Sequence, residues 1–164
     1  MKIKYRALIL GLVIFAFLSG GCLEKPFGTK EARSGEVKLG KVKIQAEPIA
    51  YSPIMSSTPG IGLTPLWTLG RPMKDFDFHW NANYGFFLSW GPPDYKVEEL
   101  GGNVINKGEK IYWSYDPNDI GKEKPSVKIS LTIEDAQSGK ILTVSYLEIE
   151  WEDQGIAKVK EDPV

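Results

Sequence analysis

The chain has 164 residues, of which 42% are hydrophobic and 25% charged, and its formal net charge is −1. A chain of this length can bury a sizeable core within one domain, so it needs no disulfide or metal to fold. The nearly balanced charge argues against nucleic acid as a partner. The single cysteine excludes a disulfide within the chain.

The first part of the sequence has the pattern of an export signal. Lys2, Lys4 and Arg6 form a positive segment without acidic residues, and an unbroken apolar run extends from Ala7 to Leu18. About 20 apolar residues are needed to cross a bilayer, so this run is too short to span one unaided, but it suits the apolar core of a signal peptide. We expect residues 1–21 to be a signal peptide.

The residues LSGGC, Leu18 to Cys22, place small side chains directly before the only cysteine. This segment resembles the lipobox of prokaryotic membrane lipoproteins, with Ser19 where the commonest pattern has leucine. The resemblance covers only the leader. It implies that Cys22 is acylated, for example with palmitate, and that the mature protein is held at the outer side of the cell membrane. The alternative is an uncleaved anchor helix over residues 5–23.

Residues 22–35 are expected to form a lipidated N-terminus and a flexible linker, because they combine Pro, Gly, Ser and charge without any sustained period. Basic side chains predominate from residue 23 to residue 46. Such a segment either contacts anionic lipid headgroups or is an ordinary solvated tether. The remaining residues, 36–164, are expected to form one domain.

The domain begins with a predicted strand over residues 37–46, where Lys alternates with Val and Ile and Gly40 marks a bulge. Residues 48–65 are rich in Pro, Ser, Gly and Thr, so they predict a long irregular connection.

Eight aromatic residues fall between Asp75 and Tyr95. Alternation predicts a hairpin with one apolar face on each strand, ended by a Gly-Pro-Pro sequence. The inward residues of this hairpin would be Phe76, Phe78, Trp80, Tyr84, Phe86, Leu88 and Trp90.

Two candidate sites arise near this stretch. Some aromatic residues fit the alternation poorly or lie outside it, and they could form an exposed platform that stacks on sugars or on a partner protein: Tyr51, Trp67, Tyr84, Phe87 and Tyr95. The polar row opposite the apolar face offers metal ligands, although alternate residues of one strand stand about 7 Å apart: Asp75, Asp77 and His79.

Further along, Asn106-Lys107-Gly108 predicts a turn that joins residues 104–105 to residues 110–115 as a second hairpin. Asp116 to Asp119, DPND, has oxygen ligands suited to calcium, but it is more typical of a turn with proline at its second position.

The clearest pattern is at residues 127–134, where Val127, Ile129, Leu131 and Ile133 alternate with polar residues. DAQSGK supplies a turn, and residues 141–151 return as the partner strand, so the sequence predicts a hairpin closed at Gly139. Glu148, Glu150 and Glu152 are expected on the solvated face of its second strand.

These elements predict an all-β domain, an antiparallel β-sandwich of the immunoglobulin-like kind, because short strands are separated by turns and no segment has a helical period. The predicted core includes Phe78, Trp80, Phe86, Leu88, Ile129, Leu131 and Ile133.

No GxSxG, HExxH, CxxC or phosphate-loop motif occurs in the sequence. We therefore expect no catalytic residues and no cofactor. The leading interpretation is a surface-anchored lipoprotein whose domain is a non-enzymatic accessory or protein-interaction module. The alternative is an extracytoplasmic binding module for carbohydrate, through the exposed aromatic residues, or for a divalent metal, through Asp75, Asp77 and His79.

Overall fold

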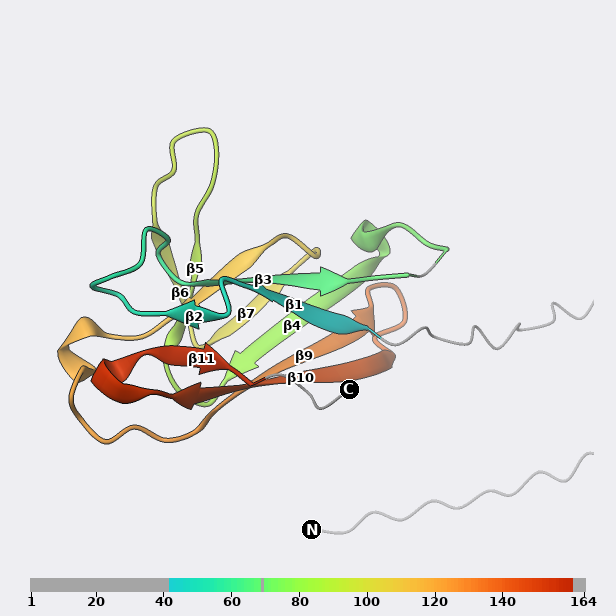
Figure 1. Ribbon diagram of the computed structural model, residues 1–164. Coiled ribbons are helices and arrows are strands. Elements are labelled where there is room, and N and C mark those ends of the chain that lie inside the picture. The colour runs from blue at the N-terminus through green and yellow to red at the C-terminus, as the bar shows by residue number, and fades with distance from the viewer. Residues whose placement is uncertain (1–41, 69, 161–164) are drawn as a thin grey trace, which may run out of the picture. The chain divides into compact units, whose positions relative to one another are not determined.

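A computed structural model of the protein describes residues 42–68 and 70–160. Within these residues the protein is all-β, with antiparallel strands in two sheets and no α-helix, as the sequence predicts (Figure 1). The leader, Cys22, the linker and Gly40 lie outside the described residues. None of the described segments is a helix long and apolar enough to span a membrane.

One sheet has five strands. In spatial order they are β1 (Lys43–Glu47), β3 (Ile61–Leu66), β8 (Ile111–Ser114), β5 (Phe86–Ser89) and β6 (Glu98–Gly101).

The other sheet has six strands. In spatial order they are β2 (Ala50–Tyr51), β11 (Ala157–Val159), β10 (Ile141–Trp151), β9 (Val127–Asp135), β4 (Phe76–Ala82) and β7 (Asn103–Asn106). Three short 3₁₀ turns lie between strands: η1 (Met73–Asp75), η2 (Pro117–Asp119) and η3 (Asp153–Gly155).

The β9–β10 hairpin confirms the clearest sequence prediction. The apolar residues of β9 are fully buried and its polar residues are not, and Gly139 has the positive φ, 69°, that the turn requires. Asp135 accepts hydrogen bonds from Arg71 Nη1 and from the backbone N–H groups of Gln137 and Ser138. These bonds stabilise the charged carboxylate, the bond from Arg71 most strongly, and lower the pKa of Asp135 to about 2.

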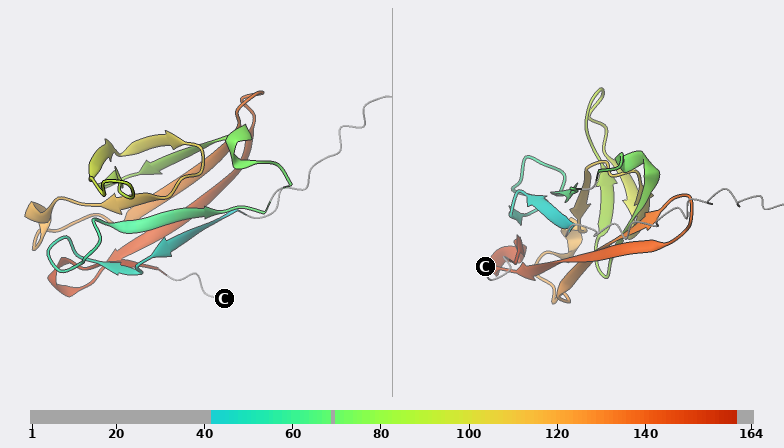
Figure 2. Two further views of the ribbon diagram at one scale, coloured as in Figure 1. Left: turned by 90° about the horizontal axis from the view of Figure 1, so that it is seen from above. Right: turned by 90° about the vertical axis from the view of Figure 1, so that its right-hand side faces the viewer.

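Figure 2 shows the strands of the two sheets from two further sides. Buried side chains from both sheets form one hydrophobic core. Most of the predicted core residues are buried there: Phe78, Trp80, Ile129, Leu131 and Ile133. Leu88 is also buried, but it lies on the outer face of β5 beside Tyr112, so its assignment to this core is wrong. Phe86 is only half-buried, so its assignment to the core is wrong.

The predicted aromatic hairpin is also wrong, because β4 belongs to the six-stranded sheet and β5 to the five-stranded sheet. The chain crosses between sheets at residues 83–85, where Gly85 has a φ of 77°. This turn resets the alternation, so Phe87 shares the core face with Trp113, its partner on β8, and Phe86 lies on the opposite face with Ser114.

The second predicted hairpin is wrong for the same reason. β7 pairs with β4, and β8 pairs with β3 and β5 in the other sheet. Gly108 does take a positive φ, 97°, but its turn joins two sheets. A turn sequence specifies local backbone angles and does not specify which sheet the next strand joins.

The predicted irregular connection contains strand structure, because residues 48–65 include β2 and most of β3. Ile61 and Leu63 are fully buried. Pro65 lies beyond Leu63, the last residue of β3 that pairs with β8, so at Pro65 the strand is paired on one side only.

Candidate functional site

A row of directly paired residues crosses the outer face of the five-stranded sheet, the face turned away from the core. The register places one residue from each strand in this row: Glu47, Gly62, Tyr112, Leu88 and Glu99. Paired residues of neighbouring strands point to the same side of a sheet. The row therefore has an aromatic centre and a carboxylate at each end.

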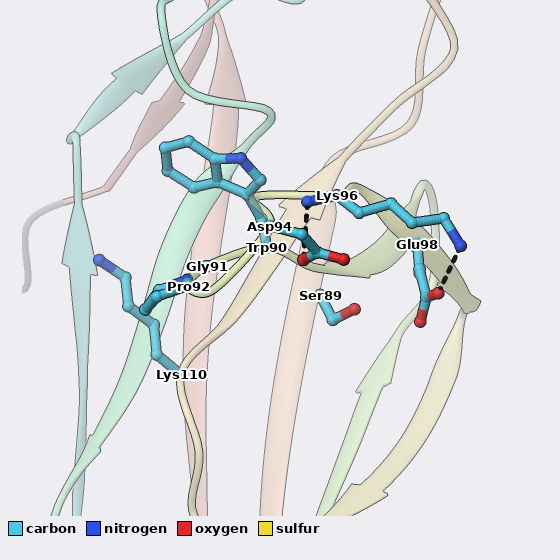
Figure 3. Close-up of a pocket in the computed structure, with 8 residues that line it drawn as sticks. All are labelled: Ser89, Trp90, Gly91, Pro92, Asp94, Lys96, Glu98 and Lys110. Carbon is cyan, nitrogen blue, oxygen red and sulfur yellow. Dashed lines mark hydrogen bonds and ion pairs between the residues drawn. The ribbon is translucent and has the colours of Figure 1, made fainter.

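Two hollows lie over this face, and both are lined by Trp90 and Lys110. The larger, of about 610 Å³, is bounded by Glu47, Pro48, Ala50, Met55, Ser56, Ser57, Thr58 and Tyr112. The smaller, of about 330 Å³, is bounded by Ser89, Gly91, Pro92, Asp94, Lys96 and Glu98 (Figure 3). We refer to the two hollows together, with the neighbouring ring of Tyr95, as the aromatic groove.

Three aromatic rings support the groove. The Trp90 ring stands nearly perpendicular to Tyr112, with centroids 5.4 Å apart and an interplanar angle of 78°. It also contacts the Tyr95 ring edge to face, at 5.5 Å. Edge-to-face contacts of this kind hold rings in defined orientations. Tyr112 is buried beneath, Trp90 is half-buried, and Tyr95 remains 57% exposed.

Lys110 lies across the sheet because Gly62 leaves room for it. A Cβ atom at Gly62 would stand 2.3 Å from Lys110 Cε. The Lys110 ammonium lies 5.1 Å from the centroid of the Tyr112 ring, within the range of a cation–π contact. A positive charge is thereby held at the junction of the two hollows.

The loop between β5 and β6 carries Tyr95 in a strained conformation. Its φ is 53°, in the left-handed region that a bulky residue seldom adopts. The Tyr95 N–H donates to Gly91 O at 2.9 Å, which closes the loop on itself. Strain of this kind costs on the order of 1–3 kcal/mol and gathers at ligand sites. The loop geometry thus holds the Tyr95 ring against Trp90.

The groove is lined by both positively and negatively charged side chains. Lys96 Nζ donates to Glu98 Oε1 at 2.8 Å, and this hydrogen bond raises the pKa of Lys96. In Figure 3 the Trp90 indole points away from this pair. Within the described residues, neither Glu47 nor Lys110 has an ion-pair partner. Both groups are therefore available to a polar ligand.

Exposed aliphatic side chains occur in the same loops. Four of them adjoin groove residues in the sequence and are between 48% and 68% exposed: Ile49, Ile54, Met55 and Val97. Such side chains extend the apolar surface that a large partner would contact.

The aromatic residues predicted as an exposed platform are not brought together. Phe87 is fully buried, and Tyr51 is buried with its hydroxyl donating to Pro59 O. Trp67 packs on Phe76, and the Tyr84 hydroxyl donates to Asp119 Oδ2 at 2.7 Å. Tyr95 alone of the five reaches the groove.

The residues predicted as a polar row on one strand make separate pairs, and Asp75 belongs to η1 rather than to β4. Asp77 lies 2.6 Å from Lys107 Nζ, His79 Nε2 lies 3.5 Å from Glu134 Oε2, and Asp75 lies 3.7 Å from Arg71. No group of three or more His, Cys, Asp or Glu side chains in the described part of the chain is placed to share a metal ion.

The other acidic segments have local roles. Asp116 caps the N-terminal end of η2, where its carboxylate accepts a hydrogen bond from Asn118 N at 2.8 Å, as the turn interpretation of DPND predicts. Glu148 and Glu150 contact Lys160, and Glu152 contacts Lys158.

The sequence patterns do not indicate Trp90, Lys110 and Tyr112 as site residues. Continuing the alternation of residues 84–88 predicts a core position for Trp90, whereas Trp90 is half-buried and lines the groove. One signal was available, because Trp90 directly precedes Gly91-Pro92-Pro93, and a ring at the end of a strand lies beside a surface loop.

Comparison of the chain with protein-family models, with curated proteins and with solved structures found no match.

Proposed function

We propose that the protein is a lipid-anchored, outward-facing accessory domain that acts by binding a partner molecule and has no enzymatic activity. The observation that carries this proposal is the aromatic groove, which combines the exposed ring of Tyr95 and the half-buried ring of Trp90 with Glu47 and Lys110, two charged groups without an ion-pair partner among the described residues. No catalytic motif accompanies it in the sequence.

The position of the groove suits a tethered binding domain. Glu47, at the end of β1, lines the groove, whereas the chain that comes from Cys22 enters the strand at its beginning, after Val42. At about 3.3 Å per residue, the first and last residues of β1 are about 13 Å apart. The tether is therefore joined to the domain at the end of β1 that is opposite Glu47.

The anchor itself is tested at Cys22. We expect the full chain, expressed in a host that processes lipoproteins, to have the mass of residues 22–164 plus acyl chains and to partition into membranes. Cys22→Ser should abolish the acylation, because serine offers no thiol. Finding the wild-type chain with an unmodified cysteine on an uncleaved leader would contradict the proposed anchor.

The groove is tested by crosslinking on intact cells. A photoreactive benzophenone residue is placed at Tyr95, and in a second variant at Tyr146, which is exposed to the same degree, 59% against 57%, but lies on β10 of the other sheet. We expect a defined crosslinked product from position 95 and none from position 146. Equal labelling at the two positions, or none at either, would contradict binding at the groove.

We also propose that the two sheets have an immunoglobulin-like arrangement. It is supported by two antiparallel sheets that share one core.

A further inference from the structure

We infer that the partner held in the aromatic groove is a carbohydrate chain. This inference rests on the proposed function, because it names the chemical class of the molecule that the same groove binds.

The rings of the groove suit the apolar faces of sugars. A pyranose ring carries C–H groups on its faces and hydroxyl groups around its edge, so it packs flat on an aromatic ring that is open to solvent. Tyr95 is 57% exposed and Trp90 is half-buried, and their contact at 5.5 Å and 64° turns their faces in different directions. Two differently inclined rings side by side can contact successive units of a twisted chain.

The polar groups around the rings suit the hydroxyl groups of sugars. Carboxylates accept hydrogen bonds from hydroxyls, and an ammonium group donates to them. The larger hollow places Glu47 and Lys110 beside Trp90 and Tyr112, and adds the hydroxyls of Ser57 and Thr58. The smaller hollow is lined by Asp94 and Glu98, and Trp90 lines both hollows. Both hollows therefore combine one aromatic surface with several polar partners.

The location of the groove favours a carbohydrate over an extended peptide. Peptides that lie along sheets are held mainly through the unpaired backbone groups of an edge strand. The centre of the groove is Tyr112 on β8, and β8 is paired on both sides, with β3 and with β5. A ligand that lies over β8 is therefore contacted through side chains, and the rings, carboxylates and hydroxyls around Tyr112 are groups that bind sugars.

The test uses the purified full chain in a detergent without a sugar headgroup. Soluble linear hexasaccharides built from glucose (β-1,4 and β-1,3), mannose, xylose and N-acetylglucosamine serve as probes, and binding is measured by calorimetry. We expect saturable binding of at least one of them. Trp90→Ala should weaken that binding about tenfold, since one aromatic contact is removed. Tyr95→Ala should weaken it about threefold, and the matched variant Tyr146→Ala should leave it unchanged.

Melting temperatures establish that each variant is folded, and if Trp90→Ala fails to fold, the exposed Tyr95 decides the outcome. Binding that persists unchanged in the groove variants would overturn the inference. Absence of binding to every hexasaccharide would overturn it too. If position 95 still crosslinks to a protein in that case, the proposed function stands and the partner is a protein. If no crosslink forms either, both proposals fail.

Discussion

Phe87→Ala should destabilise the domain by about 3–5 kcal/mol, the range found when a large ring is removed from a packed core. Phe87 is fully buried, pairs with Trp113 on β8, and has its ring centroid 6.3 Å from that of Trp80 across the core. Its removal would leave a cavity between the two sheets that neither sheet can close without moving its strands. Equilibrium denaturation of the full chain measures the loss.

The neighbouring residue provides the control. Phe86 has the same side chain, but it is half-buried on the outer face of the same strand, beside Ser114. We expect Phe86→Ala to cost about 1 kcal/mol, because less apolar area returns to water and no internal cavity forms. The alternation in the sequence predicts the opposite order, with the larger loss of stability in Phe86→Ala. A larger loss of stability in Phe86→Ala than in Phe87→Ala would therefore contradict the placement of β5.

Gly85→Ala should be destabilising by about 3 kcal/mol, for two separable reasons. First, Gly85 has a φ of 77°, which costs a residue with a Cβ atom about 1 kcal/mol. Second, the added Cβ would stand 2.4 Å from Ser114 O and 2.7 Å from Trp113 Nε1. Overlap with a packed backbone costs a further 1–3 kcal/mol or so. The displacement would also disturb the hydrogen bond that Trp113 Nε1 donates to Tyr84 O.

A variant at Gly121 separates the cost of the positive φ from the cost of the steric overlap. Its φ is 81°, close to that of Gly85, but no atom lies within 4 Å of the position of an added Cβ. Gly121→Ala should therefore show the conformational cost alone, about 1 kcal/mol. Thermal denaturation of both variants gives the comparison, and equal losses would show that Gly85 does not approach β8 as closely as described.

The local sequence was sufficient to predict those elements whose contacts join residues close together in the chain. The alternation of residues 127–134 and the turn at Gly139 predicted the β9–β10 hairpin, because the two strands adjoin in sequence and share one apolar face. The same reasoning placed Phe78 and Trp80 in the core. The all-β class follows from the same period of two, which does not depend on which strands pair.

The choice of sheet for each strand required the tertiary structure. A period of two predicts a strand with one buried face. When two sheets share a core, such a strand fits equally well in either sheet. Residues 81–83 and 106–108 therefore read as hairpin turns, although the chain crosses from one sheet to the other between β4 and β5 and between β7 and β8. Long-range packing, such as that of Phe87 beside Trp113, decides which sheet each strand joins. A local sequence pattern carries no information about such contacts.

The aromatic groove depends even more on distant contacts. Its walls come from four separate segments of the chain: residues 47–50, 55–58, 89–98 and 110–112. Sequence showed that aromatic residues were plentiful and that Tyr95 fitted the core pattern poorly. Only the strand order β1-β3-β8-β5-β6 places Glu47, Tyr112 and Trp90 on one surface, because a site shared among non-adjacent strands is created by pairing and leaves no periodic trace along the chain.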